Sequence, residues 1–194
     1  MPLADPLPIT PFTHPIQGAV ELPGSKSITN RALILAALAK GTTTLTGALF
    51  SRDSRIMVAA LQTLGFMVTA DESNHTIVVE GRDGEIPAAF AKIHVGNAGT
   101  AARFLTALVC LRRNGTYYLD GDEAMRKRPI GSLLDALTEQ GAHADSRSFP
   151  FTLKTAGLRG GEVSVDASES SQMLSALLLA GSRAHSPLKI NITG

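Results

Sequence analysis

An internal repeat constrains the fold of this 194-residue chain more than any other feature. Three stretches follow one plan: a short strand-like segment, a turn of small and polar residues, an Ala/Leu-rich helix of about three turns, and a strand that ends in glycine. They cover residues 20–47, 93–121 and 163–194, so their starts are separated by 73 and 70 residues. A nearly constant period of this size indicates a supersecondary unit that recurs along the chain.

A second pattern fills the gaps between these stretches. Residues 53–81 and 128–157 each predict an amphipathic helix that stops at a glycine, Gly65 or Gly141, and is followed by a hairpin of two strands. The complete unit is therefore β-α-β-α-β-β. We predict an α/β (α+β) fold in which this unit occurs twice in full, while the third copy stops half-way, at Gly194.

The repeat also predicts how the chain is organised. The proline-rich start is typical of an extended arm with little structure of its own. Because the third unit is truncated, we expect the remainder to be an incomplete first domain that belongs to a longer protein. The expected parts are an arm over 1–19 and a domain over 20–194, which consists of units 20–92, 93–162 and 163–194.

The arrangement of such units suggests where a ligand would bind. Packed around a common axis, they would bury the first helix of each copy and turn their sheets outward. The equivalent helix N-termini would then meet at one end of the domain. Helix N-termini carry free N–H groups and a partial positive charge, so this end is expected to favour anions.

The first of these helix N-termini carries two cations and two hydroxyls. In LPGSKSITNRAL, Ser27 and Arg31 are four residues apart and therefore share a helix face, while Lys26 approaches from the turn. A G-x-x-x-x-G-K-[ST] phosphate loop does not fit, because Ser25 rather than glycine precedes Lys26. A serine N-cap followed by a solvated arginine remains an alternative interpretation of this stretch alone.

The second helix N-terminus lies in GNAGTAAR, residues 96–103. Here Gly99 permits a close approach of the backbone to a ligand, Thr100 supplies a hydroxyl, and Arg103 lies one turn inside the helix. The alternative is a glycine-containing strand-to-helix turn that Thr100 caps.

The third helix N-terminus is preceded by DASESSQM, which contains Ser170, Ser171 and Gln172. Another basic segment, MRKRPIG, places Arg128 before Pro129, a residue suited to the first turn of a helix. Together these segments suit a small ligand that carries phosphate and carboxylate groups. Arginine holds such groups bidentately, and lysine can also transfer a proton.

Composition excludes several classes of function. The formal net charge of +1 provides no global field that would attract nucleic acid or an anionic membrane. No apolar run reaches the ~18 residues that a membrane span needs, and the N-terminus lacks the features of a secretory signal. We therefore expect a cytoplasmic protein with neither nucleic-acid nor membrane partners. The single cysteine, Cys110, excludes an internal disulfide, and the five histidines lack ligand spacing, so we predict no metal site.

Four motifs in this order resemble the 5-enolpyruvylshikimate-3-phosphate (EPSP) synthase, or 3-phosphoshikimate 1-carboxyvinyltransferase, family of the shikimate pathway, which serves aromatic amino acid biosynthesis. They are LPGSKSITNRAL, GNAGTAAR, MRKRPIG and DASESSQMLSALL, and the resemblance runs from about residue 14 to the last residue. It implies two domains, each an inside-out α/β barrel of three β-α-β-α-β-β units with buried helices and outer sheets. The substrates would bind between this domain and a second domain of the same enzyme.

The resemblance also implies the reaction and its residues. The enolpyruvyl group of phosphoenolpyruvate passes to the 5-hydroxyl of shikimate 3-phosphate, phosphate leaves, and no cofactor is needed. Lys26 would contact both substrates and take part in proton transfer. Shikimate 3-phosphate would also be bound by Ser27, Arg31, Ser170, Ser171 and Gln172. Phosphoenolpyruvate would also be bound by Gly99, Arg128 and Gln172, with Asn97, Thr100 and Arg103 supporting the turn.

Two departures from the family pattern carry expectations of their own. Phe104 stands where many members have Pro or Leu, which we expect to alter helix packing behind Gly99 and the response to glyphosate, the family's phosphoenolpyruvate-competitive inhibitor. The groups that the family places in its second domain lie beyond this chain, so we expect the isolated chain to lack turnover.

Two alternatives remain: an enzyme like the UDP-N-acetylglucosamine enolpyruvyl transferases, which have Lys-Asn at the first motif, and a non-catalytic anion-binding module.

Overall fold

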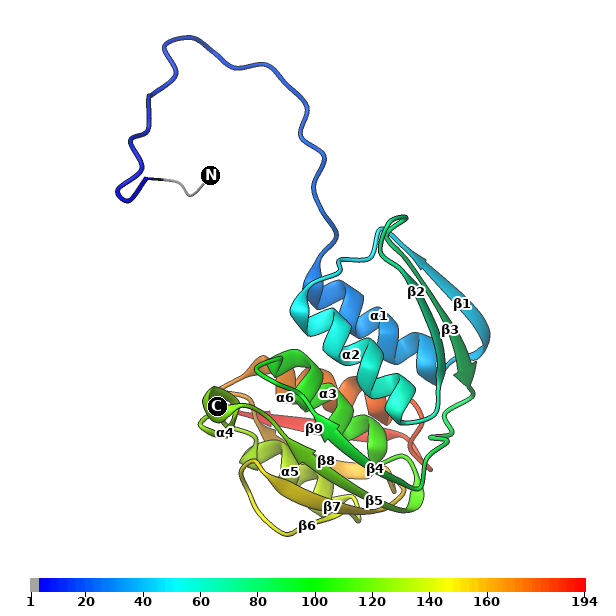
Figure 1. Ribbon diagram of the computed structural model, residues 1–194. Coiled ribbons are helices and arrows are strands. Elements are labelled where there is room, and N and C mark those ends of the chain that lie inside the picture. Colours follow the sequence, from blue (N-terminus) through cyan, green and yellow to red (C-terminus); the bar gives the residue numbers. More distant parts are fainter. Residues whose placement is uncertain (1–3) are drawn as a thin grey trace.

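A computed structural model describes residues 4–194 and shows the repeat as a series of α/β units (Figure 1). The first unit contains α1 (Lys26–Leu38), β1 (Lys40–Thr46), α2 (Arg52–Thr63), β2 (Met67–Asp71) and β3 (Thr76–Arg82). The second contains β4 (Phe90–His94), α3 (Gly99–Val109), β5 (Arg113–Asp120), α4 (Glu123–Arg126), α5 (Gly131–Glu139), β6 (His143–Ala144) and β7 (Phe151–Ala156). The third contains β8 (Gly161–Asp166), α6 (Ser171–Gly181) and β9 (Leu188–Thr193).

Each unit has its own sheet. The strand orders are β1-β3-β2, β4-β5-β7-β6 and β8-β9. Strands β4 and β5 are parallel and are joined through α3, and β8 and β9 are parallel and joined through α6. These two equivalent crossovers confirm the predicted repeated α/β fold. Within residues 4–194 the three sheets remain separate and do not close into a barrel.

One predicted strand does not form. The sequence predicts a strand-like segment immediately before α1, yet residues 20–22 are irregular, and Val20 and Leu22 are 84% and 82% exposed. A strand is stabilised when one of its faces is covered and its backbone is paired, and this segment has neither. The first sheet consequently lacks the parallel pair of the other two, and β1 pairs only with β3.

The core lies where the three repeated helices meet. Helices α1, α3 and α6 all pack against one another, and every residue of α3 is buried. Helix α1 is less buried than the repeat predicted for the first helix of each copy, because Ile28 and Leu35 on one stripe are exposed. Leu178 of α6 is also 59% exposed. Within the described residues, no element covers these apolar side chains.

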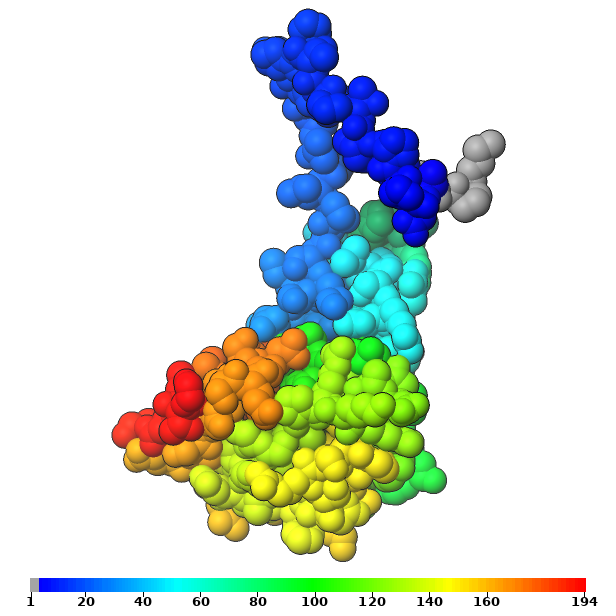
Figure 2. Space-filling view, turned by 90° about the vertical axis from the view of Figure 1, so that its left-hand side faces the viewer, coloured from blue at the N-terminus to red at the C-terminus, as the bar shows by residue number. Residues whose placement is uncertain are grey.

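The segment before α1 extends away from this body. Residues 4–23 contain no helix or strand, and the backbone runs outward as a single extended arm (Figures 1 and 2). No helix within residues 4–194 has the length and apolar character to cross a membrane.

Candidate active site

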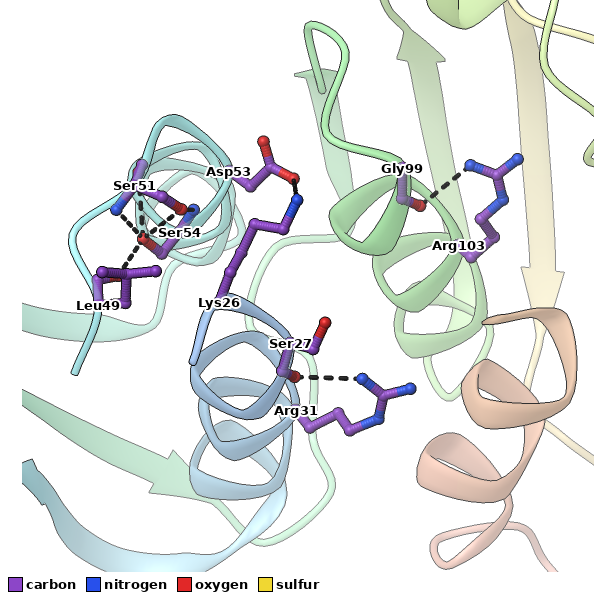
Figure 3. A network of polar contacts seen from close by, with 9 residues as sticks. All are labelled: Lys26, Ser27, Arg31, Leu49, Ser51, Asp53, Ser54, Gly99 and Arg103. Atoms are coloured by element: carbon purple, nitrogen blue, oxygen red, sulfur yellow. Dashed lines mark hydrogen bonds and ion pairs between the residues drawn. The ribbon is translucent and has the colours of Figure 1, made fainter. Parts of the chain in front are cut away.

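The N-terminal ends of α1, α3 and α6 lie close together. Arg31 on α1 donates from Nη2 to Oγ of Ser175 on α6 at 3.0 Å. At the start of α3, a methyl group added to Gly99 would lie 3.5 Å from Oε1 of Gln172 on α6. The predicted meeting of equivalent helix ends is therefore present, and Figure 3 shows residues from α1, α2 and α3 around it.

Lys26 is held at the start of α1 by an ion pair. Its Nζ lies 3.0 Å from Oδ2 of Asp53, and the two side chains are 46% and 19% exposed (Figure 3). Asp53 belongs to the first turn of α2, where the helix dipole favours a negative charge. The ammonium group is thus fixed above the helix end and keeps access to solvent. Sequence reasoning did not identify Asp53 as part of the site.

The position of Asp53 follows from the capping of α2. Ser51 is the N-cap: its Oγ accepts from the backbone N–H of Ser54, and Oγ of Ser54 accepts from the N–H of Ser51 at 2.8 Å. Oγ of Ser54 also donates to the carbonyl of Leu49. This reciprocal arrangement is a capping box, which fixes the start of the helix. The serine pair therefore determines where Asp53 meets Lys26.

Ser25 and Arg31 complete the start of α1. Ser25 is the N-cap and accepts from the N–H of Ile28, as the alternative interpretation expected. Arg31 is not a solvated side chain, however, because it donates to the backbone carbonyl of Ser27 at 3.2 Å as well as to Ser175. No carboxylate within residues 4–194 forms an ion pair with Arg31. Its charge therefore remains available to an anion.

Helix α3 begins without a side-chain cap. Ala98 occupies the N-cap position, and Thr100 lies inside the first turn, which excludes the alternative in which Thr100 caps the turn. The first N–H groups of a helix have no partner within the helix. At α1 and α6, serine side chains accept hydrogen bonds from such groups. Of the three helix N-termini, the start of α3 is therefore the one where no side-chain cap competes with an external anion for the free N–H groups.

Arg128 lies beside this uncapped end. A methyl group added to Gly99 would lie 2.8 Å from Nη1 of Arg128, which places the guanidinium against the glycine. Its neighbours in the sequence are paired, Arg126 with Asp120 and Lys127 with Glu123. In the part of the chain that the structure describes, Arg128 has no such carboxylate. It is thus the one cation of the MRKRPIG segment left for a ligand.

Arg103 connects the start of α3 to the segment that carries Arg128. It is buried and donates from Nη1 to the carbonyl of Gly99 at 3.1 Å and from Nη2 to the carbonyl of Pro129. Burial, and then the positive charge of Arg128, lower the pKa of Arg103 from its ordinary value. These contacts tie the start of α3 to the MRKRPIG segment. Thr100 is buried as well, while Oδ1 of Asn97 is buried without a hydrogen-bond partner in residues 4–194.

The predicted residues of the third segment surround the start of α6. Ser170 is the N-cap, and its Oγ accepts from the N–H of Gln172. Ser171 is the first helical residue and is exposed. Gln172 is half-buried and directs its amide toward Gly99. Arg128 and Gln172 therefore both lie beside Gly99. Arg31 is hydrogen-bonded to Ser175 of α6, a residue that sequence reasoning missed.

Other reactive groups lie outside this site. Cys110 is fully buried near the end of α3, and burial raises the pKa of its thiol. Among residues 4–194, no three His, Cys, Asp or Glu side chains form a cluster able to hold a metal ion.

The chain has the fold of the enolpyruvyl transferases. The structure resembles that of EPSP synthase from Acinetobacter baumannii with a TM-score of 0.79 and 25% sequence identity, covering 91% of this chain and 40% of the other. The sequence profile of the EPSP synthase (3-phosphoshikimate 1-carboxyvinyltransferase) family matches residues 12–194. The chain belongs to this family.

Curated relatives agree with this family. The chain is 51% identical over 198 residues to a 3-phosphoshikimate 1-carboxyvinyltransferase from Opitutus terrae, covering 100% of this chain and 46% of the relative. It is 46% identical to the protein of the same name from Pseudomonas savastanoi pv. phaseolicola, covering 97% of this chain and 45% of the relative. The chain thus spans about half the length of the curated relatives it matches. The enolpyruvyl transferase NikO from Streptomyces tendae, at 18% identity and a TM-score of 0.65, shares the fold.

Proposed function

We propose that the protein takes part in the transfer of the enolpyruvyl group from phosphoenolpyruvate to the 5-hydroxyl of shikimate 3-phosphate, with release of phosphate. The observation that carries the proposal is the uncapped start of α3 beside Arg128, a guanidinium that no carboxylate among the described residues pairs with. Free helix N–H groups and an adjacent arginine suit a phosphate or carboxylate. In this proposal, the described residues act together with a second domain of the same enzyme, in the cytoplasm.

The proposed shikimate 3-phosphate site lies between α1 and α6. Arg31 supplies a positive charge between the two helices, and the serine hydroxyls at their N-termini supply hydrogen bonds. A charge-assisted contact to the phosphate would add to the partial positive charge of both helix ends. The residues proposed to bind this substrate are Lys26, Ser27, Arg31, Ser170, Ser171 and Gln172.

The proposed phosphoenolpyruvate site lies at the start of α3. Gly99 presents its backbone without a side chain, and Arg128 and Gln172 flank it. Lys26 would serve both substrates because its ammonium group is anchored by Asp53 and is half-exposed. Asn97, Thr100 and Arg103 would maintain the turn rather than contact the substrate.

The chemistry requires no redox step. The 5-hydroxyl oxygen bonds to C2 of phosphoenolpyruvate, the hydroxyl loses its proton, and C3 gains one, which yields a tetrahedral intermediate. Loss of phosphate from C2 and of a proton from C3 then restores the double bond. Lys26 is the proposed group of this chain for proton transfer, since lysine can donate and accept a proton.

Calorimetric titration of the 194-residue chain with shikimate 3-phosphate tests the proposal. We expect Arg31→Ala to weaken binding by about 10- to 150-fold, because a hydrogen bond to a charged group contributes ~1.5–3 kcal/mol. Arg126→Ala is the matched control, since its guanidinium is already paired with Asp120. Exposed pairs contribute ~0–1 kcal/mol to stability, and we expect no effect of this variant on binding.

Three results would contradict the proposed site. Equal losses for the two variants would show that Arg31 has no special role. Binding of UDP-N-acetylglucosamine in place of shikimate 3-phosphate would favour the alternative enolpyruvyl transfer reaction. Binding of inorganic phosphate with the same affinity as shikimate 3-phosphate would favour a non-catalytic anion-binding module.

A further inference from the structure

The ring of Phe104 lies beneath the guanidinium group of Arg31. The distance from Cζ of Arg31 to the ring centroid is 5.0 Å. Phe104 lies on α3 and is almost completely buried, whereas Arg31 lies on α1. A cation within about 6 Å of an aromatic ring, over its face, is attracted by the ring quadrupole. The contact therefore joins a core side chain to a site residue.

Three elements together determine where the guanidinium lies. The carbonyl of Ser27 accepts from Nη1 on its own helix, Oγ of Ser175 accepts from Nη2 on α6, and the Phe104 ring supports one face from α3. An arginine has five N–H donors, so these two bonds leave others for a ligand. A free arginine side chain loses rotamer entropy when it binds, and a side chain already held in place loses less.

We propose that Phe104 is a positioning residue, which holds Arg31 ready for the phosphorylated substrate and thereby raises the affinity for shikimate 3-phosphate. The inference rests on the function proposed above. An aliphatic residue could fill the core at position 104, but it has no ring quadrupole to attract the guanidinium. Loss of the Phe104 ring would therefore lower the affinity for shikimate 3-phosphate by more than the loss of core packing alone would.

Phe104→Leu tests this inference, with Phe151→Leu as the matched control. Both phenylalanines are almost completely buried, but Phe151 packs against Phe149, and no cation of residues 4–194 lies over its ring. We expect both variants to lose comparable thermal stability, as buried aromatic residues do when they are shortened. Affinity for shikimate 3-phosphate should fall about 3- to 30-fold in Phe104→Leu, the range that a cation–π contact gives. It should fall less than about twofold in Phe151→Leu.

A spectroscopic readout separates positioning from general destabilisation. The Nε–Hε resonance of Arg31, assigned from its loss in Arg31→Lys, should carry a ring-current shift in the unliganded chain. That shift should disappear in Phe104→Leu and remain in Phe151→Leu. Phe104→Met offers a second ringless variant, unbranched and flexible, if Phe104→Leu does not fold.

The outcomes distinguish this inference from the function on which it rests. Unchanged affinity in Phe104→Leu or Phe104→Met, with an unchanged Arg31 resonance, would overturn the role of Phe104. If the unaltered chain does not bind shikimate 3-phosphate, the proposed function fails, and the Arg31 resonance still decides whether the ring positions the guanidinium. Equal loss of affinity in Phe104→Leu and Phe151→Leu would reduce the effect to packing and would also overturn the inference.

Discussion

At the scale of single residues, the site is defined by which charges already have partners. Arg126 and Lys127 are paired with carboxylates, whereas Lys26 is anchored by Asp53 but remains half-exposed and accessible to a ligand. Arg31 and Arg128 instead contact carbonyl, hydroxyl or glycine groups, which leave their positive charge uncompensated. The sequence alone identifies three helix N-termini and the MRKRPIG segment as candidates. Only the three-dimensional pairing separates the available cations from those already neutralised.

Gly99→Ala should separate ligand binding from stability. The new methyl group would lie 2.8 Å from Nη1 of Arg128 and 3.0 Å from Nη1 of the buried Arg103, so the Arg128 guanidinium must move and that of Arg103 must shift slightly. Gly99 is the first residue of α3, and replacing glycine by alanine in a helix favours the fold by up to ~1 kcal/mol. We expect little net change in thermal stability, because the gain in helix propensity is offset by the shift of Arg103. Phosphoenolpyruvate binding should become at least about tenfold weaker, since one charge-assisted contact is displaced. Calorimetry in the presence of shikimate 3-phosphate measures the second effect.

Gly131→Ala is the matched control for this prediction. Gly131 is the first residue of α5, and an added methyl group would meet its nearest neighbour, the carbonyl of Arg147, at 3.4 Å. Gly131→Ala should therefore keep or raise the thermal stability and leave phosphoenolpyruvate binding unchanged. Unchanged phosphoenolpyruvate affinity in Gly99→Ala would remove Gly99 from the proposed site.

Asp120 should give stability a dependence on pH. Hydrogen bonds from Arg126, and to a lesser extent from the N–H of Gly121, hold the pKa of Asp120 below its ordinary value. The ionised carboxylate therefore stabilises the folded state above the unfolded pKa of about 3.9, and this contribution is lost as pH falls through the folded pKa. Asp120→Asn should be less stable than the unaltered chain at pH 7, and the difference should vanish in acid.

Urea unfolding at several pH values measures this difference. Adding Arg126→Gln to Asp120→Asn should lower the unfolding free energy little further, because the carboxylate partner of Arg126 is already absent. A constant difference in unfolding free energy from pH 7 down to pH 2 would contradict the linkage.

At the scale of helices and strands, the sequence predicted those features that are determined by residues close to one another in the chain. Gly65 and Gly141 end α2 and α5 with positive φ angles of 88° and 106°, as their positions predicted. The parallel crossovers through α3 and α6 follow from hydrophobic spacing. The segment at 20–22 has the same local pattern but forms no strand, since a strand depends on a neighbour that the local sequence does not encode.

The contacts that complete the site could not be predicted for the same reason. Asp53 meets Lys26 only because α2 packs beside α1, and Ser175 meets Arg31 only because α6 does. The Phe104 ring likewise reaches Arg31 from a third helix. Helix N-termini and their caps are determined by residues close in sequence. The side chain that lies opposite each cation is determined by tertiary packing.

Ser51→Ala should destabilise the chain through the start of α2. Loss of an N-cap serine costs about 0.5–2 kcal/mol, and here it also breaks the reciprocal bond with Ser54. Denaturant unfolding should show a lower midpoint with an unchanged m-value. Ser164→Ala, on the exposed face of β8, should remain within about 0.5 kcal/mol of the unaltered chain. Equal stability of the two variants would show that the capping box does not fix α2.

At the scale of the whole molecule, the units share one core but leave an apolar surface. Ile28 and Leu35 of α1 and Leu178 of α6 are all exposed, although they belong to the helices that form the centre of the structure. Exposed apolar patches favour association. We therefore expect the 194-residue chain to form dimers or larger species as its concentration rises, and to bind a hydrophobic dye.

Leu178→Gln should reduce both effects. Sedimentation velocity over a concentration series measures association, and dye fluorescence measures the exposed apolar surface. Leu177→Ala is an informative comparison, because Leu177 is fully buried and its loss should lower stability without reducing the exposed surface. A strictly monomeric chain that binds no dye would contradict this prediction.

The outer edge of β1 has a further consequence. β1 has β3 on one side, and within residues 4–194 no strand on the other, so half of its backbone N–H and C=O groups point outward. Its sequence, KGTTTLT, has one charged residue, and β-branched threonines accept strand neighbours readily. The edge can therefore pair with an additional strand. A strand added there would give the first sheet four strands, the number that the second sheet already has. Amide hydrogen exchange along β1 should accordingly alternate, fast at the outward N–H groups and slow at those bound to β3.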